Sequence, residues 1–459
     1  MQPEQLFAVV DARRTVFVSR LIEYLRQPSI SAHGIGMAEV AAFLHSWLAQ
    51  LGFAPRLLPT PGWPVVYGRR RDRPGAPTIL FYGHYDVQPP DPLDAWVSPP
   101  FEPAIRNGRI YARGAGDNKG QHFAQLLAIE TLLEQTATLP CNVVVLLEGE
   151  EEVGSPHLAS FVREHRDLLA CDLVVTADGP VHESGQSCIL FGVRGVLSFE
   201  LRARGANRDL HSGNFGNIAP NPIWQLVHLL ATMKDAQGTI LIDGFYDRVE
   251  PPTALERAAL AALPVDEARI LHELGLHAFD APAGRSYAER LSLWPTLTIN
   301  GLHGGYGGSG SKTVLPHEAV AKCDIRLVAS QTVADTFARL AAHVGLHAPD
   351  VELIFQGGME PSKTPLDSAY AAPLQRSLAA VHGREPLCIP AMGGSLPDYV
   401  FTQILGVPAF VVPYANHDED NHAPNENIEV ERFIAGIKTG MAIMQHLGRL
   451  SANGTTSES

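Results

Sequence analysis

Apolar and polar positions alternate with two different spacings along the chain. Residues 1–30 carry apolar side chains at helical spacing, which predicts a helical segment. An amphipathic stretch at 120–135 predicts a further helix. Four short, continuous apolar runs predict strands: 77–82, 142–147, 172–176 and 408–412. This alternation is typical of an α/β domain whose central strands are covered on both faces.

The stretch from 192 to 358 has a different pattern. It combines predicted strands at 196–203, 296–300 and 319–328 with helical runs at 222–234 and 333–344. The Pro-rich segment 241–287 between them is predicted to be irregular. We therefore predict an α+β domain at 192–358, inserted into an α/β domain.

The remaining segments complete the first domain. It would consist of residues 1–191 and 359–450, with its last strand near Pro408 and its last helix at 431–447. Residues 451–459 are small and polar, so we expect a disordered tail.

Composition excludes several classes of partner. Of the 459 residues, 45% are apolar and 18% charged, which is an ordinary globular balance. A net charge of −14 without a basic run argues against nucleic acid or membrane partners. The five cysteines stand far apart without a CxxC pair, which argues against disulfides and thiolate metal sites. With no secretory signal pattern at the start of the sequence, we expect a cytoplasmic location.

Acids and histidines follow the predicted strands of the first domain. His84 and Asp86 follow the first run, 150–152 is a run of three glutamates after the second, and Asp178 follows the third. His417, Asp418 and His422 follow the fourth, and Asp117 precedes the helix predicted at 120–135. Because ligands bind outside the carboxyl ends of strands in open α/β sheets, we expect these side chains to meet.

Such a dense group of acids predicts bound cations, because unneutralised carboxylates repel one another. Imidazole and carboxylate ligands without thiolate suit zinc, and also manganese or cobalt. Two histidines with three or four carboxylates would be enough for two ions about 3.5–4 Å apart. Taken singly, His84 could be a core histidine, Asp178 a turn residue and Asp117 a helix cap. Their shared position after buried strands favours the metal site.

Six motifs resemble, in order, those of the M20 metallopeptidases. They are Gly83–Pro89, Arg113–Gly120, Glu148–Ser155, Asp209–Gly213, Ile325–Val328 and His422–Glu426. The resemblance runs from about residue 20 to 447, and Gly308–Val314 resembles the cytosolic dipeptidase and carnosinase-like branch. It implies a zinc-peptidase-like catalytic domain with a mainly parallel sheet, and an inserted lid or dimerisation domain. Val153 and residues 359–364 depart from that branch.

The resemblance also implies which residues hold the metals. His84 and Asp178 would bind one ion, Glu152 and His422 the second, and Asp117 both. The peptide bond between Asp117 and Asn118 is often cis in this family.

Further roles come from the same resemblance. Asp86 would orient His84, and Glu151 would be the general base, which leaves Glu150 as a surface acid without a role. His211 would stabilise the oxyanion from the partner subunit of a homodimer formed through the lid domain.

The resemblance implies a substrate-binding set as well. Arg326 would bind the substrate carboxylate, assisted by Thr313 and Ser395. Without the resemblance, Arg326 would be read as an exposed strand arginine.

The predicted function is hydrolysis of the amide bond of dipeptides or similar small peptides with a free carboxylate. Two divalent ions, zinc being expected, would hold a water whose proton Glu151 accepts. An N-acyl-amino-acid deacylase or other amidohydrolase of the same family remains the alternative, because it would share this metal set.

Two other classes fit the sequence less well. Residues 305–310 satisfy GxGxxG, but no helical pattern follows and Ser311 stands where a phosphate loop needs glycine, which disfavours nucleotide binding. A non-catalytic relative would lack a ligand or the base, and none is missing.

Overall fold

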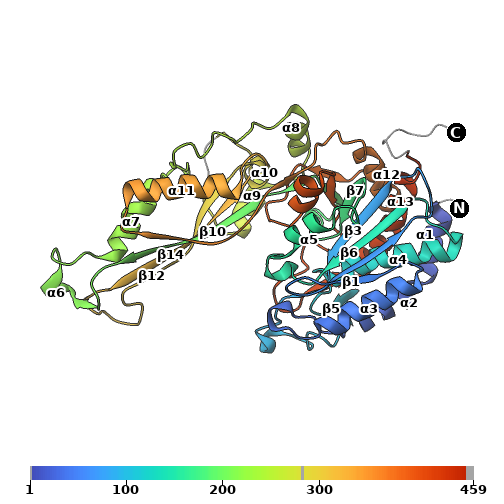
Figure 1. The fold of residues 1–459 in the computed structure, drawn as a ribbon, viewed down its shortest axis with the longest axis horizontal. Helices are drawn as coiled ribbons and strands as arrows, with labels where there is room; N and C mark the ends of the chain where they lie inside the picture. The colour runs from blue at the N-terminus through green and yellow to red at the C-terminus, as the bar shows by residue number, and fades with distance from the viewer. Residues whose placement is uncertain (1–2, 281–283, 451–459) are drawn as a thin grey trace. The chain divides into compact units, whose positions relative to one another are not determined.

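The computed structural model describes residues 3–280 and 284–450 (Figure 1). The described chain forms two compact units. The first contains the residues up to Gly192, Lys363–Ile389 and those from Val400 onward, and the second contains Val193–Ser362 and Pro390–Tyr399. From the sequence pattern, residues 390–399 are predicted to belong to the first domain. In the structure this segment is bound to the second unit by backbone hydrogen bonds from Arg194 to Met392 and Gly394. The predicted tail, 451–459, lies outside the described residues.

The first unit is built on an eight-stranded sheet with the order β1-β2-β6-β3-β7-β18-β8-β17. Its strands are β1 Arg56–Leu58, β2 Val65–Arg70, β3 Thr78–His84, β6 Asn142–Glu148, β7 Leu173–Thr176, β8 Cys188–Leu190, β17 Leu387–Ile389 and β18 Ala409–Val411. The neighbours β6, β3, β7 and β18 are parallel and coincide with the four predicted strands, which confirms a mainly parallel central sheet. β1 and β2, which no apolar run in the sequence predicts, extend the sheet in antiparallel fashion.

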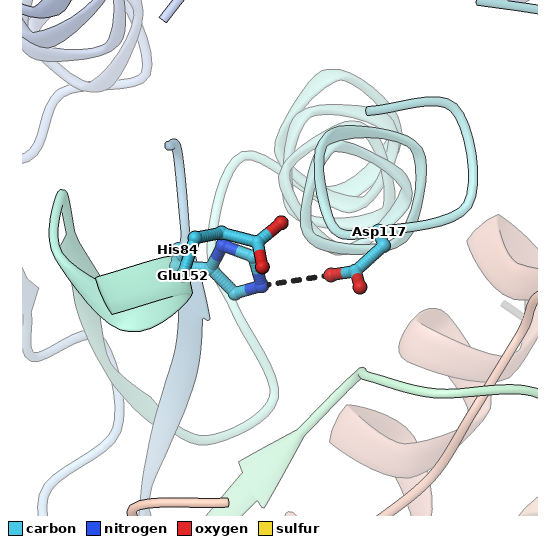
Figure 2. Close-up of side chains that lie close together, drawn as sticks. All are labelled: His84, Asp117 and Glu152. Carbon is cyan, nitrogen blue, oxygen red and sulfur yellow. Dashed lines mark ion pairs between the residues drawn. The ribbon is translucent and has the colours of Figure 1, made fainter. Parts of the chain in front are cut away.

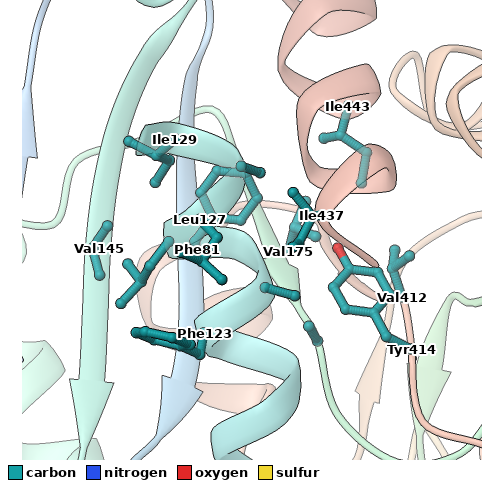
Figure 3. Packing of buried hydrophobic residues seen from close by; sticks show 14 of the residues in the cluster. Phe81, Phe123, Leu127, Ile129, Val145, Val175, Val412, Tyr414, Ile437 and Ile443 are labelled. Carbon is teal, nitrogen blue, oxygen red and sulfur yellow. The ribbon is translucent and has the colours of Figure 1, made fainter. Parts of the chain in front are cut away.

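Side chains from both faces of the central strands are buried. Ile79 and Phe81 of β3 join the large apolar core that α4 (Lys119–Thr136) and α13 (Val430–Leu447) cover (Figure 3). Tyr82 faces the other way, and its ring contacts Phe401 of the π-helix Val400–Leu405. Because both faces are covered, these strands read as unbroken apolar runs.

Further helices of the first unit pack against the same core, with one on the opposite face. They are α1 Pro3–Ala12, α2 Arg14–Leu25, α3 Met37–Gln50 and α12 Ala371–His382 in the core, and α5 Leu158–Glu164 beside the π-helix. The segment predicted to be helical at 1–30 is thus two helices that meet at Arg13. Short strands and turns complete the unit: β4 Ala104–Arg106, β5 Arg109–Tyr111, β19 Asn427–Glu429, η1 Ser31–His33 and η2 Leu93–Ala95.

The second unit is an antiparallel sheet with the order β12-β14-β10-β15, covered by two helices. These elements are β10 Gly195–Arg204, β12 Thr296–Gly304, β14 Glu318–Leu327, β15 Glu352–Met359, α7 Pro222–Met233 and α11 Val333–His347. Smaller elements are β11 Leu210–His211, β13 Val314–Leu315 and α6 Ser212–Phe215. The two-stranded sheet of β9 Gly192–Val193 and β16 Ser362–Lys363 stands where the chain passes from one unit to the other. Alternate side chains of β10 and β14 form the apolar core of the second unit with α7 and α11.

The segment 241–287 is more regular than predicted. It contains α8 Ala254–Ala261 and α9 Glu267–Glu273, and α10 (Tyr287–Leu293) begins at its end. Each begins at a side-chain cap, from Thr253, Asp266 and Ser286 respectively. The prediction was wrong because helices this short show little periodicity, while capping side chains are enough to start them. Among the described residues, no helix is long and apolar enough to cross a bilayer.

Candidate metal centre

The carboxyl ends of the four parallel strands carry the predicted ligands. His84 is the last residue of β3, and Asp178 stands two residues beyond β7. Glu152 lies in η3, Glu151–Val153, just after β6. His422 lies in the loop between β18 and β19, and Asp117 lies two residues before α4.

All five side chains converge. His84 Nε2 lies 3.0 Å from Asp117 Oδ1 and 3.5 Å from Asp178 Oδ2. His422 Nε2 lies 3.1 Å from Asp117 Oδ2 and 3.0 Å from Glu152 Oε2. Asp117 thus presents one oxygen to each histidine. Figure 2 shows His84, Asp117 and Glu152, whose ligand atoms all lie within 4.8 Å of one another.

Two of these atoms are buried without a hydrogen-bond partner. His84 Nε2 approaches the carboxylates without hydrogen-bond geometry, and Asp178 Oδ2 accepts no donor. His84 is fully buried and Asp178 is 4% exposed. Buried polar atoms in native proteins nearly always have partners, and imidazole with carboxylates is a common ligand set for divalent cations. The residues therefore fit a bound divalent metal.

The charges in this cluster shift one another's pKa values. Burial and, to a smaller extent, the Asp117 carboxylate together raise the pKa of Glu152 to about 7. Hydrogen bonds to Asp117 and Glu152 raise the pKa of His422 to about 10. Burial opposes ionisation of Asp117, but His422 and His84 hold the pKa of Asp117 well below its ordinary range. A divalent cation must displace the protons that these groups share, so its binding must depend on pH.

Asp86 supports both sides of the site. Its carbonyl oxygen lies 3.1 Å and its Oδ1 3.3 Å from His84 Nδ1, so Asp86 orients the His84 ring through both groups. The same carboxylate accepts the backbone N–H groups of Glu151 at 3.2 Å and Glu152 at 3.1 Å. Asp86 therefore also holds η3 in place, a role that the sequence analysis did not identify.

Asn118 joins the ends of two strands to α4. Its Oδ1 accepts the backbone N–H of His84 at 3.3 Å and lies 3.1 Å from His122 Nδ1. Its Nδ2 donates to the Ala177 carbonyl at 2.5 Å, just before Asp178. The Asp117–Asn118 peptide is cis, as the resemblance implied. Asn118 has no predicted role, although its position beside Asp117 in a shared motif is a usable signal.

Glu426 shapes the loop that carries Asp117. It pairs with Arg113 at 2.7 Å and accepts the backbone N–H groups of Gly114, Gly116 and Asp117 at 2.9–3.0 Å. Glu426 is fully buried and Arg113 is 1% exposed. Glu426 was visible only as the last residue of a motif, without a role.

Two residues near Glu151 and Glu152 have contacts that the sequence did not predict. Gln88 had no predicted role, yet its side chain donates to Glu152 Oε2 at 3.0 Å. Glu150 was predicted to be a surface acid, which is wrong. It is 8% exposed and its Oε2 lies 2.8 Å from His157 Nδ1, so it belongs to the packing behind η3.

The predicted substrate-binding residues of the second unit form two pairs. Thr313 Oγ1 lies 3.5 Å from His211 Nε2, and Arg326 donates to Ser395 Oγ at 2.8 Å. Because His211 Nδ1 accepts the Gly213 N–H at 3.1 Å, the neutral ring carries its proton on Nε2.

The two pairs lie far apart within one chain. Thr313 and His211 lie at the β11–β13 pair, just before β14 begins at Glu318, and Arg326 lies near the end of β14. The nine residues from Glu318 to Arg326 in extended β14 span roughly 26 Å. The structure therefore separates Thr313 from Arg326, which the sequence analysis had grouped together.

Comparison with known proteins gives consistent matches over almost the whole chain. A family model described as peptidase family M20/M25/M40 matches residues 80–446. The Beta-Ala-His dipeptidase of Homo sapiens is 28% identical over 97% of this chain and 93% of its own length. The Cys-Gly metallodipeptidase DUG1 of Candida albicans is 30% identical over 98% of both chains. The crystal structure of the M20 family metallo-carboxypeptidase Sso-CP2 from Sulfolobus solfataricus has a TM-score of 0.88 at 36% identity, covering 95% of this chain and 99% of that one.

Proposed function

The chain belongs to peptidase family M20/M25/M40, and from that membership we propose that it is a metal-dependent dipeptidase acting on small peptides with a free carboxylate. Relatives that match this chain over nearly its full length are named as dipeptidases, among them the human and Candida albicans proteins. The observation that carries the proposal is the convergence of two histidines and three carboxylates at the carboxyl ends of β3, β6, β7 and β18.

We assign two divalent ions to this cluster, with zinc first and manganese or cobalt as alternatives. His84 and Asp178 would hold one ion, Glu152 and His422 the other, and Asp117 both, consistent with its placing one oxygen toward each histidine. Such ions supply positive charge that lowers the pKa of an attacking water and polarises the scissile carbonyl.

Glu151 is the proposed general base. Its backbone N–H is bound by Asp86, which fixes its position next to the ligand Glu152. Burial raises the pKa of Glu151, and the charges of Asp178 and Glu152 raise it further, against the opposing effect of His84. A carboxylate whose pKa is raised accepts a proton from water more readily. It then passes that proton to the departing amine.

The substrate carboxylate is assigned to Arg326, whose planar guanidinium already holds the Ser395 hydroxyl. The protonated Nε2 of His211 is a suitable donor to a developing oxyanion, and Thr313 lies beside it. Since most of the length of β14, roughly 26 Å from Glu318 to Arg326, lies between these pairs within one chain, a second copy is the natural source of His211 and Thr313. We therefore propose a homodimer formed through the second unit, with the first unit as the catalytic domain and the second as a lid and dimerisation domain.

We also propose a cytoplasmic location. All five cysteines are free thiols, and Cys141, Cys188 and Cys323 are buried. Free thiols are typical of a reducing compartment.

The test compares unblocked dipeptides with N-acyl amino acids as substrates of protein reconstituted with zinc or manganese. The proposal predicts a higher kcat/KM for dipeptides. Preference for N-acyl amino acids would support the deacylase alternative, and hydrolysis of neither class would contradict both.

A further inference from the structure

Arg194 is a buried cation without a carboxylate partner. It directly precedes β10 and is 8% exposed. Its guanidinium donates only to backbone carbonyls, from Nε to Gly393 O at 2.8 Å and from Nη1 to Trp294 O at 3.3 Å. Within the part of the chain that the structure describes, no carboxylate lies within ion-pair distance of it. A buried charge without a counter-ion is costly, so an arginine kept in this state needs an explanation.

The charge around Arg194 is positive. Burial is the larger cause that lowers the pKa of Arg194, and the nearby Arg326 guanidinium lowers it as well. Together they bring it to about 10. Arg194 therefore remains charged at neutral pH. The acid that counteracts this shift is Asp324, whose Oδ1 lies 3.7 Å from Arg326 Nε and whose Oδ2 accepts from Asn300. Two guanidinium groups and one carboxylate leave one positive charge, which suits an anion.

Arg194 also holds the loop that presents Ser395. Its backbone N–H lies 3.2 Å from Met392 O and 3.1 Å from Gly394 O, in addition to the bond from its side chain to Gly393. A loop with two consecutive glycines has wide conformational freedom, and these bonds restrict it. Ser395 then meets Arg326 Nη1 at 2.8 Å.

We propose that Arg194 is a positioning residue of the subsite that binds the substrate's free carboxylate. It fixes the Gly393–Ser395 loop so that Ser395 and Arg326 face the carboxylate together, and its charge adds to that of Arg326. This inference rests on the proposed function, because it concerns recognition of the same substrate.

The experiment measures how strongly the enzyme prefers a free carboxylate. Alanyl-alanine and alanyl-alanine amide, or another dipeptide and its amide if the wild type hydrolyses that faster, are compared in wild type, Arg194→Met and Arg194→Lys. Arg204→Met is the matched control, because Arg204 ends the same strand and is 64% exposed. Circular dichroism and metal content check that each variant is folded and loaded.

For Arg194→Met we expect kcat/KM for the free-acid dipeptide to fall at least about tenfold, mainly through a higher KM. The value of kcat/KM for the dipeptide amide should change much less. Arg194→Lys, which keeps the charge but not the planar fork, should recover part of the preference. If Arg194→Met does not fold, the preference of Arg194→Lys for the acid over the amide decides the question. Arg204→Met should keep the wild-type ratio of acid to amide.

If Arg194→Met lowers kcat/KM equally for the acid and the amide, or leaves both values as in the wild type, the inference is overturned. Arg194 would then be a structural residue only. A wild-type protein that hydrolyses no dipeptide would contradict the proposed function itself, so the two failures are distinguishable.

Discussion

The predicted metal ligands and the residues that hold them in place differ in how visible they are in the sequence. His84, Asp117, Glu152, Asp178 and His422 follow strands or precede a helix in chemically suggestive patterns, and the structure brings them together. Glu426 was not assigned a role, because it acts on Asp117 from 309 residues away through a backbone N–H. A side chain that binds backbone across such a separation leaves no spacing pattern, so only the fold reveals it.

At this scale, Glu151→Gln tests the general base. The amide cannot accept a proton, so we expect turnover below about 1% of wild type with the metal content and fold unchanged. Steady-state kinetics and elemental analysis measure this. Glu164→Gln, an exposed change at the end of α5, is the control. Substantial remaining activity in Glu151→Gln would remove Glu151 as the base.

Asp86→Asn tests the support behind the ligands. The Glu151 and Glu152 N–H groups donate to different oxygens of Asp86, so an asparagine would turn its NH2 donor toward one of them. We expect metal affinity to fall about 10–100-fold, as measured by competition with a chromogenic chelator. Exposed Asp94→Asn in η2 should behave as wild type. Unchanged affinity in Asp86→Asn would show that the carboxylate is dispensable.

At the scale of elements, burial decided which strands and helices could be predicted from the sequence. β3, β6, β7 and β18 are buried on both faces and appear as continuous apolar runs, so the sequence predicts them well. The three-residue strand β1 has two exposed residues and gives no such run. Likewise, α8 and α9 depend on caps rather than on a long apolar stripe.

Gly83→Ala tests the close packing of β3 against α4. A methyl group on Gly83 would lie 2.7 Å from His122 Cβ and 2.9 Å from Asn118 Oδ1. We expect the free energy of unfolding to drop by about 1–3 kcal/mol, with weaker metal binding because His84 is adjacent. Thermal unfolding of the metal-free and metal-loaded protein measures both effects.

The control for this change is Gly345→Ala in α11. A methyl group there meets nothing within 4 Å. In a helix it should stabilise by about 0.4–1 kcal/mol. A Gly83→Ala protein as stable as wild type would mean that β3 and α4 can separate without cost.

At the scale of the whole molecule, the sequence alone indicated an insertion of one domain into another. It could not place residues 390–399, because the bonds that tie them to the second unit come from Arg194, almost 200 residues earlier. Nor could spacing reveal that Thr313 lies with His211 rather than with Arg326. The first follows from hydrogen bonds formed in the fold, and the second from the length and pairing of the strands.

The proposed dimer can be tested by complementation. His211→Ala and Glu151→Gln should each be inactive alone, but in a mixed dimer one site has both Glu151 and the partner subunit's His211. Random exchange at equal amounts makes half of the dimers mixed, so about a quarter of wild-type activity should return. Co-expression with two affinity tags isolates the mixed species. A mixture no more active than its components would contradict a shared site.

The central claim is that paired cations held at the strand ends make this chain a hydrolase. The direct measurement is a titration of verified metal-free protein with zinc or manganese, following bound metal and dipeptide hydrolysis together. We predict no hydrolysis without metal and activity that rises until two ions are bound per chain. Full hydrolysis by the metal-free protein, or saturation of activity without metal bound at His84, Asp117, Glu152, Asp178 and His422, would contradict this account.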